Sequence, residues 1–118
     1  MLRLFMLTLL SVLLFTSCKE YADVVVKEAT IDSTGKTIKV TPVKSNLEIE
    51  LQIVSLSDEW AQVQTTGDIM QISASQNELP ESREMDIQYY YTGTSSNSSS
   101  TLTGRASLHL IQEGKKIN

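Results

Sequence analysis

Apolar and polar residues alternate along several short segments of this chain, most clearly between residues 47 and 53. Every second position of this segment is apolar, at Leu47, Ile49, Leu51 and Ile53, and glutamate or glutamine fills the positions between them. Successive side chains of an extended strand point to opposite sides, so the pattern predicts a strand with one buried face and one solvent-facing face. We find no comparable helical periodicity, which would place apolar residues three or four positions apart.

Other segments show the same alternation or a run of β-branched residues, and turn-forming residues separate them. The sequence predicts about seven short strands, near residues 24–31, 38–41, 47–53, 60–63, 70–74, 86–91 and 106–111. Gly93 and Gly114 are expected to end the last two, and the polar segment Thr94–Thr101 between them is expected to be a loop in solvent. Such a series predicts a β-sandwich, with a small closed barrel as the alternative.

The N-terminal segment has a different character. Arg3 precedes an apolar run that ends at Phe15, and small residues then lead to Cys18. The run is shorter than the about 20 apolar residues of a membrane-spanning helix, and its charge, length and final small residues are typical of a cleaved export signal. Residues 14–18, Leu-Phe-Thr-Ser-Cys, resemble the lipobox of bacterial lipoproteins. The resemblance implies that residues 1–17 are removed and that Cys18 carries lipid.

Removal of residues 1–17 leaves 101 of the 118 residues, which is enough for one domain. We expect residues 18–23 to form a lipidated tether, residues 24–114 the folded domain and residues 115–118 a basic tail. The cut also removes one of the ten basic residues, so nine remain against 14 acidic residues and the formal charge is −5. This charge argues against nucleic acid as a partner. Because Cys18 is the only cysteine, no disulfide is expected and a hydrophobic core must stabilise the domain.

A set of residues in the second half of the chain follows the pattern of a known family. In chain order the set comprises Trp60, a glycine-containing turn, Asn77 after a strand, Arg83 before the next strand, and a closing Gln112-Glu113-Gly114. The pattern resembles the BACON domain, whose name stands for Bacteroidetes-associated carbohydrate-binding, often N-terminal. The resemblance implies an immunoglobulin-like β-sandwich in an envelope protein of the Bacteroidetes, with Arg83 as a structural residue at a strand entrance.

Two short motifs bear on location and modification. Lys19-Glu20, directly after Cys18, resembles in part the signal that directs lipoproteins of the same phylum to the outer face of the outer membrane. We therefore expect a lipid-anchored protein of the bacterial cell envelope, at the outer membrane, with the membrane as a partner through the lipid on Cys18. Asp32-Ser33-Thr34 resembles an O-glycosylation motif of that phylum, and an ordinary Asx or Ser/Thr turn explains the same residues equally well.

The sequence offers no catalytic centre. Its only histidine, His109, lies on the polar side of a predicted strand, where the sequence suggests no nucleophile or acid beside it. Neither a Gly-x-Ser-x-Gly motif nor paired metal-ligand spacing occurs. We therefore expect a protein that is not an enzyme and that uses no cofactor and no metal.

Sugar recognition is the functional hypothesis with some support in the residues. Carbohydrate-binding proteins stack aromatic rings on the C–H patches of sugars and bind the hydroxyls with amide and carboxylate groups. Trp60 and the tyrosines on both sides of Tyr90 are expected in the core, whereas Tyr90 falls on the polar face with Gln88 and Asp86. These three residues form the predicted carbohydrate site. The alternative is a non-catalytic structural spacer, or a module that docks onto other envelope proteins in a surface complex.

Overall fold

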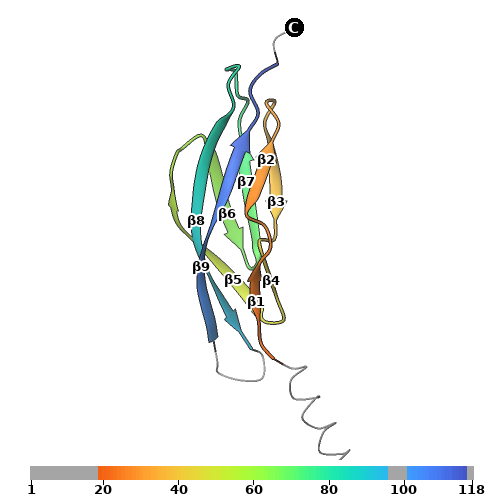
Figure 1. The fold of residues 1–118 in the computed structure, drawn as a ribbon, viewed down its shortest axis with the longest axis vertical. Helices are drawn as coiled ribbons and strands as arrows, with labels where there is room; N and C mark the ends of the chain where they lie inside the picture. The colour runs from red at the N-terminus through yellow and green to blue at the C-terminus, as the bar shows by residue number, and fades with distance from the viewer. Residues whose placement is uncertain (1–18, 96–100, 117–118) are drawn as a thin grey trace, which may run out of the picture.

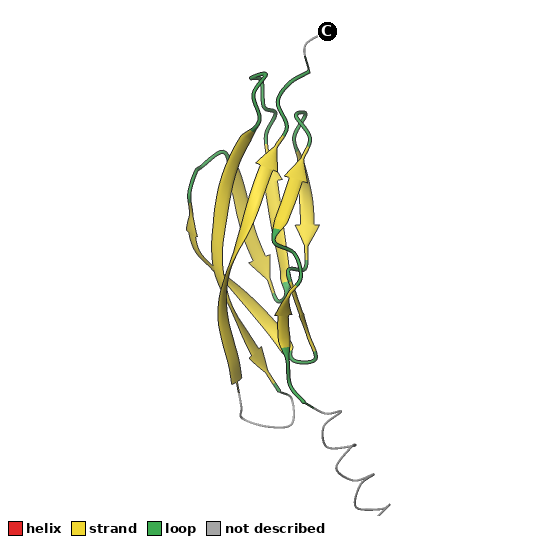
Figure 2. Cartoon of the chain, viewed as in Figure 1, coloured by secondary structure: helices red, strands yellow, loops and turns green. Residues whose placement is uncertain are grey.

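The computed structural model describes residues 19–95 and 101–116. The predicted signal segment and Cys18 lie outside the described residues, as do residues 96–100 of the predicted loop. Every regular element in the described part is a strand, so the prediction of an all-β protein is confirmed (Figure 2). No helix among the described residues is long and apolar enough to cross a membrane.

Nine strands form in the described part of the chain. They are β1 (Ala22–Val24), β2 (Glu28–Ile31), β3 (Lys36–Val40), β4 (Val43–Ser45), β5 (Glu48–Leu56), β6 (Ala61–Thr66), β7 (Ile69–Ala74), β8 (Arg83–Thr94) and β9 (Thr101–Gln112). One sheet has the order β2-β9-β8-β5, a second has the order β3-β7-β6, and β1 pairs with β4. The pairing of β2 with β9 is parallel and the others are antiparallel. The four-stranded sheet lies in front of the three-stranded sheet in a sandwich-like arrangement (Figure 1).

The alternating residues supply a core between the two sheets. In β5, Ile49 and Leu51 are buried while Glu48 and Glu50 are exposed, as the pattern predicts. The large side chains that are almost fully buried come from both sheets: Ile31, Met70, Ile72, Ile87, Tyr89, Leu108 and Leu110. Burial of each such side chain stabilises the fold by about 1.5–3 kcal/mol. Burial also raises the pKa of Tyr89 to about 12, with a smaller contribution from the nearby Tyr91.

The N-terminal half contains two more strands than the sequence predicts. The predicted strand at residues 24–31 is divided into β1 and β2. The chain leaves its pairing with β4 near Val25 and joins the four-stranded sheet as β2. At this point the N–H of Val25 donates to the carbonyl of Pro42 (2.8 Å). Pro42 interrupts the partner segment because proline has no N–H to donate. The chain resumes pairing beyond it as β4, which the sequence analysis missed.

The hairpin of β8 and β9 is longer than predicted. Strand residues occupy both ends of the predicted Thr94–Thr101 loop, and Gly93 lies inside β8. A Cβ at Gly93 would lie 2.8 Å from Cδ1 of Leu47, so the glycine allows the Leu47 side chain to pack against the strand. Pairing continues as far as Thr94 with Thr101, which satisfies the backbone of these polar residues. Polarity alone was therefore a poor guide to where these strands end.

The segment predicted as a tether belongs in part to the fold. The N–H of Tyr21 donates to Oδ1 of Asn46 (3.0 Å), and Nδ2 of Asn46 donates to the carbonyl of Lys19 (2.9 Å). β1 then begins at Ala22. These contacts hold the start of the described chain at one end of the sandwich, opposite the end where the C-terminal residues lie (Figure 1).

Candidate functional site

The three predicted site residues project from one side of β8, away from the core. Tyr90, Gln88 and Asp86 alternate with the buried Tyr89 and Ile87. The register of β5 and β9 places these neighbours beside them: Gln52 and Arg105 beside Tyr90, Ser55 and Ser107 beside Gln88, and His109 beside Asp86. We call this polar side of β5, β8 and β9 the outer face. The structure thus gathers on one surface residues that the sequence distributes over three strands.

Tyr90 is half-buried on the outer face, and its neighbours restrict it. Its hydroxyl donates a hydrogen bond to Oε1 of Gln52 on β5. Arg105 lies opposite it on β9. The ring of Tyr90 is therefore held in place before any ligand binds, which lowers the entropy cost of using it in recognition.

A depression of about 350 Å³ lies beside Tyr90 on the outer face. It is lined by Val54, Gln88, Tyr89, Arg105, Ala106 and Ser107. Val54 is the extra residue of a β-bulge between Ile53 and Ser55, and its side chain is 43% exposed. Of the predicted site residues, Gln88 lines this outer-face depression, and its Oε1 accepts a hydrogen bond from the Ser55 hydroxyl (3.2 Å). Arg105 and Ser107 are additions that the sequence analysis did not single out.

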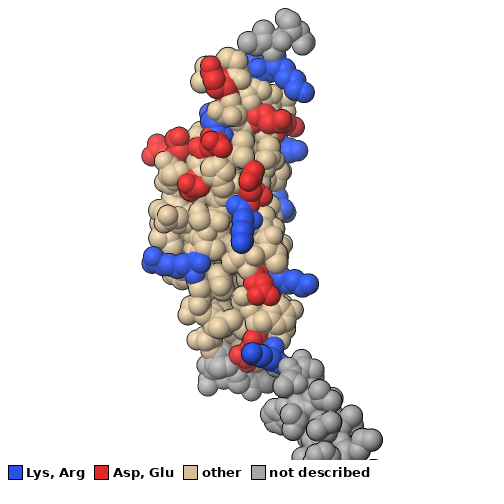
Figure 3. Space-filling model, in the orientation of Figure 1, with Lys and Arg blue, Asp and Glu red and all other residues tan. Residues whose placement is uncertain are grey.

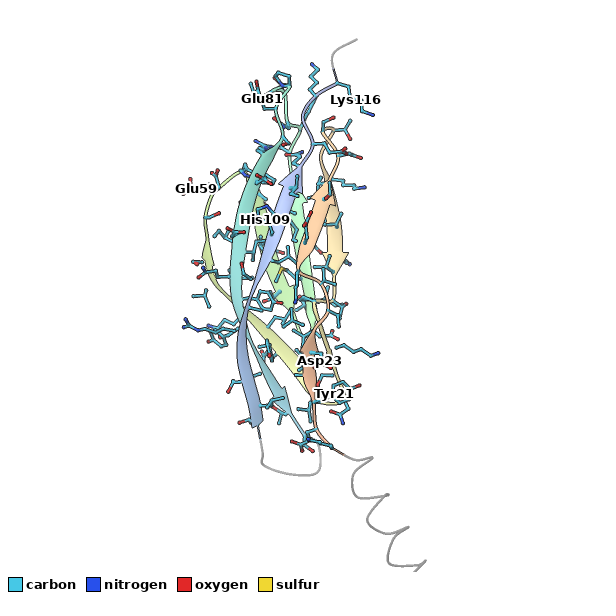
Figure 4. The ribbon with its side chains drawn as sticks, viewed as in Figure 1. Tyr21, Asp23, Glu59, Glu81, His109 and Lys116 are labelled. Atoms are coloured by element: carbon cyan, nitrogen blue, oxygen red, sulfur yellow. The ribbon has the colours of Figure 1, made fainter. Side chains whose placement is uncertain are left out.

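Asp86 contacts His109 and does not line the depression. The Nδ1 atom of His109 lies 2.7 Å from Oδ1 of Asp86, and its Nε2 atom lies 3.0 Å from Oε1 of Glu84. These two hydrogen bonds, the one to Asp86 first, raise the pKa of His109 to about 8. The expectation that no acid lies beside His109 is therefore wrong. Figure 4 labels His109 on β9, beside β8, from which both carboxylates project.

The sequence could have suggested part of this cluster. Glu84 and Asp86 are two positions apart, so they share one face of a strand. Their partner could not be foreseen, because His109 comes from another strand and register sets the contact. Among residues 19–95 and 101–116, no group of three or more His, Cys, Asp or Glu side chains is arranged to hold a metal ion. The cluster is therefore a set of charge-assisted hydrogen bonds on the outer face.

A second polar cluster is buried at the end of the sandwich away from Lys19. Gln112 is fully buried. Its Nε2 atom donates to the carbonyls of Asp32 (3.1 Å) and Ser75 (2.8 Å). Its Oε1 atom accepts a hydrogen bond from Nε of Arg83 (2.8 Å). Asn77, 2% exposed, donates to the carbonyls of Glu81 and Glu113 and accepts from the N–H of Leu79. The side chains of Gln112 and Asn77 use both their amide nitrogen and their oxygen on protein groups, which indicates a structural role.

Trp60 belongs to the same region and does not present an open aromatic platform. It is partly buried against the core, and the guanidinium carbon of Arg83 lies 4.7 Å from the centre of its ring. This is the geometry of a cation–π contact. β8 begins at Arg83, where this residue joins Trp60 to Gln112. Together with Asn77 and Gly114, these are the residues of the family pattern noted in the sequence.

Gly114 fits this cluster for a steric reason. A Cβ at this position would overlap the carbonyl group of Pro80. The following residue, Lys115, donates its N–H to the carbonyl of Leu79 (2.7 Å). The glycine therefore allows the chain after β9 to lie against the segment that precedes β8.

No protein-family model matches this chain, and no curated protein matches it. A protein of Bacteroides thetaiotaomicron solved by NMR has a similar structure, with a TM-score of 0.50, 11% identity, and coverage of 85% of this chain and 86% of that chain. A second similar structure is the Bacteroides ovatus GH5 xyloglucanase in complex with a XXXG heptasaccharide, with a TM-score of 0.47 and 12% identity. That match covers 85% of this chain and 20% of the enzyme. The first likeness shows a shared all-β fold.

Proposed function

We propose that this chain is a lipid-anchored, non-catalytic module of the bacterial cell envelope that binds carbohydrate on its outer face as an accessory protein. The observation that carries the proposal is the outer-face depression beside Tyr90. It is lined by Gln88, Ser107 and Arg105. The ring of Tyr90, whose hydroxyl is bonded to Gln52, is not part of this lining but lies opposite Arg105 on the neighbouring strand. An apolar surface with a few polar groups is the usual composition of a sugar site.

We further propose that the fold is of the immunoglobulin-like class. In that class one sheet holds the first, second, fifth and fourth strands, and the other holds the third, sixth and seventh. With β3 and β4 counted as one strand interrupted at Pro42, the order β1-β3/β4-β7-β6 matches the first sheet, and β5-β8-β9 matches the second. The parallel pairing of β2 with β9 adds the N-terminal segment to the edge of the second sheet.

Membership in the BACON family is proposed on the residues of its pattern. Trp60, Arg83 and Gln112 are widely separated in the sequence, and in the fold Arg83 contacts both of the others. Asn77 and Gly114 close the same end of the sandwich. A pattern made of residues that support one another physically is less easily met by chance than an isolated motif. An anchor on Cys18 fits this arrangement, because Tyr21, near the start of the described chain, lies at the opposite end of the sandwich (Figure 4).

The alternative function, a spacer or protein-docking module, is favoured by one specific observation. β6 is the last strand of its sheet within the described residues, so one side of its backbone pairs with no other strand. Such an edge can accept a strand from a partner protein. Figure 3 shows charges of both signs spread over the face in view, without a large patch of one sign.

A glycan array with the full chain, purified in detergent, tests the proposed function. We compare the wild type with Tyr90→Ala and with Tyr21→Ala, which removes another tyrosine, 40% exposed and located near β1. Binding that Tyr90→Ala abolishes and Tyr21→Ala leaves intact supports carbohydrate recognition on the outer face. Absence of binding by a folded wild-type protein, with calorimetry extended to millimolar sugar, contradicts it and leaves the spacer or docking module.

A further inference from the structure

We propose that the outer-face depression selects acidic sugars, and that Arg105 binds the carboxylate of a uronic acid residue there. This inference rests on the proposed function, because it names the ligand class of the same site. Arg105 is exposed on β9, lines the depression and lies opposite Tyr90. It therefore stands where a sugar stacked on or beside the tyrosine ring would present its substituents.

The charge of the depression is opposite to that of the whole chain. The chain carries 14 acidic and ten basic residues, yet none of the residues that line the depression is acidic. Within the described part of the chain, Arg105 makes no ion pair or hydrogen bond with another side chain. A guanidinium that keeps all its donors available can form two parallel hydrogen bonds with a carboxylate.

The carboxylates on the strands around Arg105 do not compete for it. Glu28 on β2 lies opposite His109, four positions along β9 from Arg105. Asp86 lies four positions along β8 from Tyr90, which is about 13 Å at strand spacing, and it already binds His109. Glu50 lies on β5, two strands from Arg105, and two register pairs further along, opposite Thr92. A ligand carboxylate at Arg105 thus meets little repulsion from these groups at physiological ionic strength, where screening acts over about 8 Å.

The remaining lining groups suit the rest of a sugar acid. Gln88 and Ser107 offer an amide and a hydroxyl on adjacent strands, which can bind ring hydroxyls as donors and acceptors. Val54 provides an apolar surface at the bulge. A volume of about 350 Å³ is at the small end of the range for ligand pockets, which suits a short saccharide.

The test is calorimetry with the full chain in detergent and two probes that share one sugar backbone, of which one is charged and the other is neutral. One probe is an oligogalacturonide, and the other is the same oligosaccharide with its carboxylates methyl-esterified. We expect the acid to bind at least tenfold more tightly than the ester, and Arg105→Gln to reduce the affinity for the acid to that for the ester. Lys39→Gln, which removes an exposed positive charge on β3, is the matched control and should leave both affinities unchanged.

The outcomes separate this inference from the proposed function. Equal binding of acid and ester, or equal losses with Arg105→Gln and Lys39→Gln, overturns the selection by Arg105 and leaves carbohydrate binding standing. A sulfated sugar that binds as tightly as the oligogalacturonide overturns the preference for a carboxylate. Binding of neither probe, together with no hit among neutral sugars, overturns both. Circular dichroism of Arg105→Gln should match the wild type, because the side chain makes no hydrogen bond or ion pair with another side chain among the described residues.

Discussion

Replacement of Gln112 by leucine should destabilise this protein severely, although the two side chains are similar in size. The substitution removes three hydrogen bonds, to the carbonyls of Asp32 and Ser75 and from Nε of Arg83. A neutral hydrogen bond contributes about 1 kcal/mol and one to a charged group about 1.5–3 kcal/mol. Gln112 is fully buried, so a leucine side chain at this position leaves its three former partners without these bonds. We expect the free energy of unfolding to fall by about 3–5 kcal/mol. For a domain of this size the melting temperature should fall by at least about 12 °C.

Urea unfolding, followed by the fluorescence of Trp60, measures this loss. Trp60 is the only tryptophan and contacts Arg83, so its emission reports on the region that is perturbed. Gln62→Leu is the matched control, because Gln62 is exposed on β6 and makes no side-chain hydrogen bond among the described residues. Its free energy of unfolding should change by no more than about 0.5 kcal/mol. A loss below about 1 kcal/mol for Gln112→Leu, or the same loss for both variants, would refute the reasoning.

Three further predictions concern the outer face, the end of β9 and the anchor. His109 has its pKa raised to about 8 in the fold, so its hydrogen bonds with Asp86 and Glu84 stabilise the protein fully below its unfolded pKa of about 6.5, and this contribution is lost as the pH rises through about 8. Proton NMR of this single histidine should give a titration midpoint near pH 8. His109→Gln should remove the dependence of the urea unfolding midpoint on pH over this range. A histidine that titrates at its ordinary pKa of about 6.5 contradicts the cluster. Gly114→Ala should cost about 1–3 kcal/mol of stability in the same unfolding assay, because the added methyl group meets the Pro80 carbonyl, and a neutral result would show that the chain end moves freely. Cys18→Ser should move the protein from the membrane fraction to the soluble or uncleaved precursor pool, and an unchanged, membrane-bound mature form would exclude lipidation at this residue.

The β8–β9 hairpin extends beyond the ends that its sequence predicts. The polarity of the segment Thr94–Thr101 predicts a loop, yet Thr94 ends β8, Thr101 begins β9, and the two residues pair with each other. Polarity reports whether a side chain is buried, whereas pairing depends on the backbone of the facing strand. The division of residues 24–31 into β1 and β2 has the same origin, because the contact near Val25 is with Pro42 of another segment.

The sequence by itself determined the all-β class and the face to which most side chains point. Alternation is a local property of the chain, so the buried positions of β5 and the outward direction of Tyr90, Gln88 and Asp86 could be read from residue order. The predicted lipid anchor on Cys18 is also a local signal, and it remains a prediction.

Tertiary structure alone decided which residues meet. The register of β8 with β9 sets Arg105 opposite Tyr90 and His109 opposite Asp86. Gln112 binds the carbonyl of Asp32 across 80 residues of sequence. Such contacts follow from hydrogen bonds between strands that are distant in the chain, and a slip of one residue in register would turn the outer-face residues toward the core. The positions of the depression and of the buried polar cluster are therefore properties of the assembled sheets.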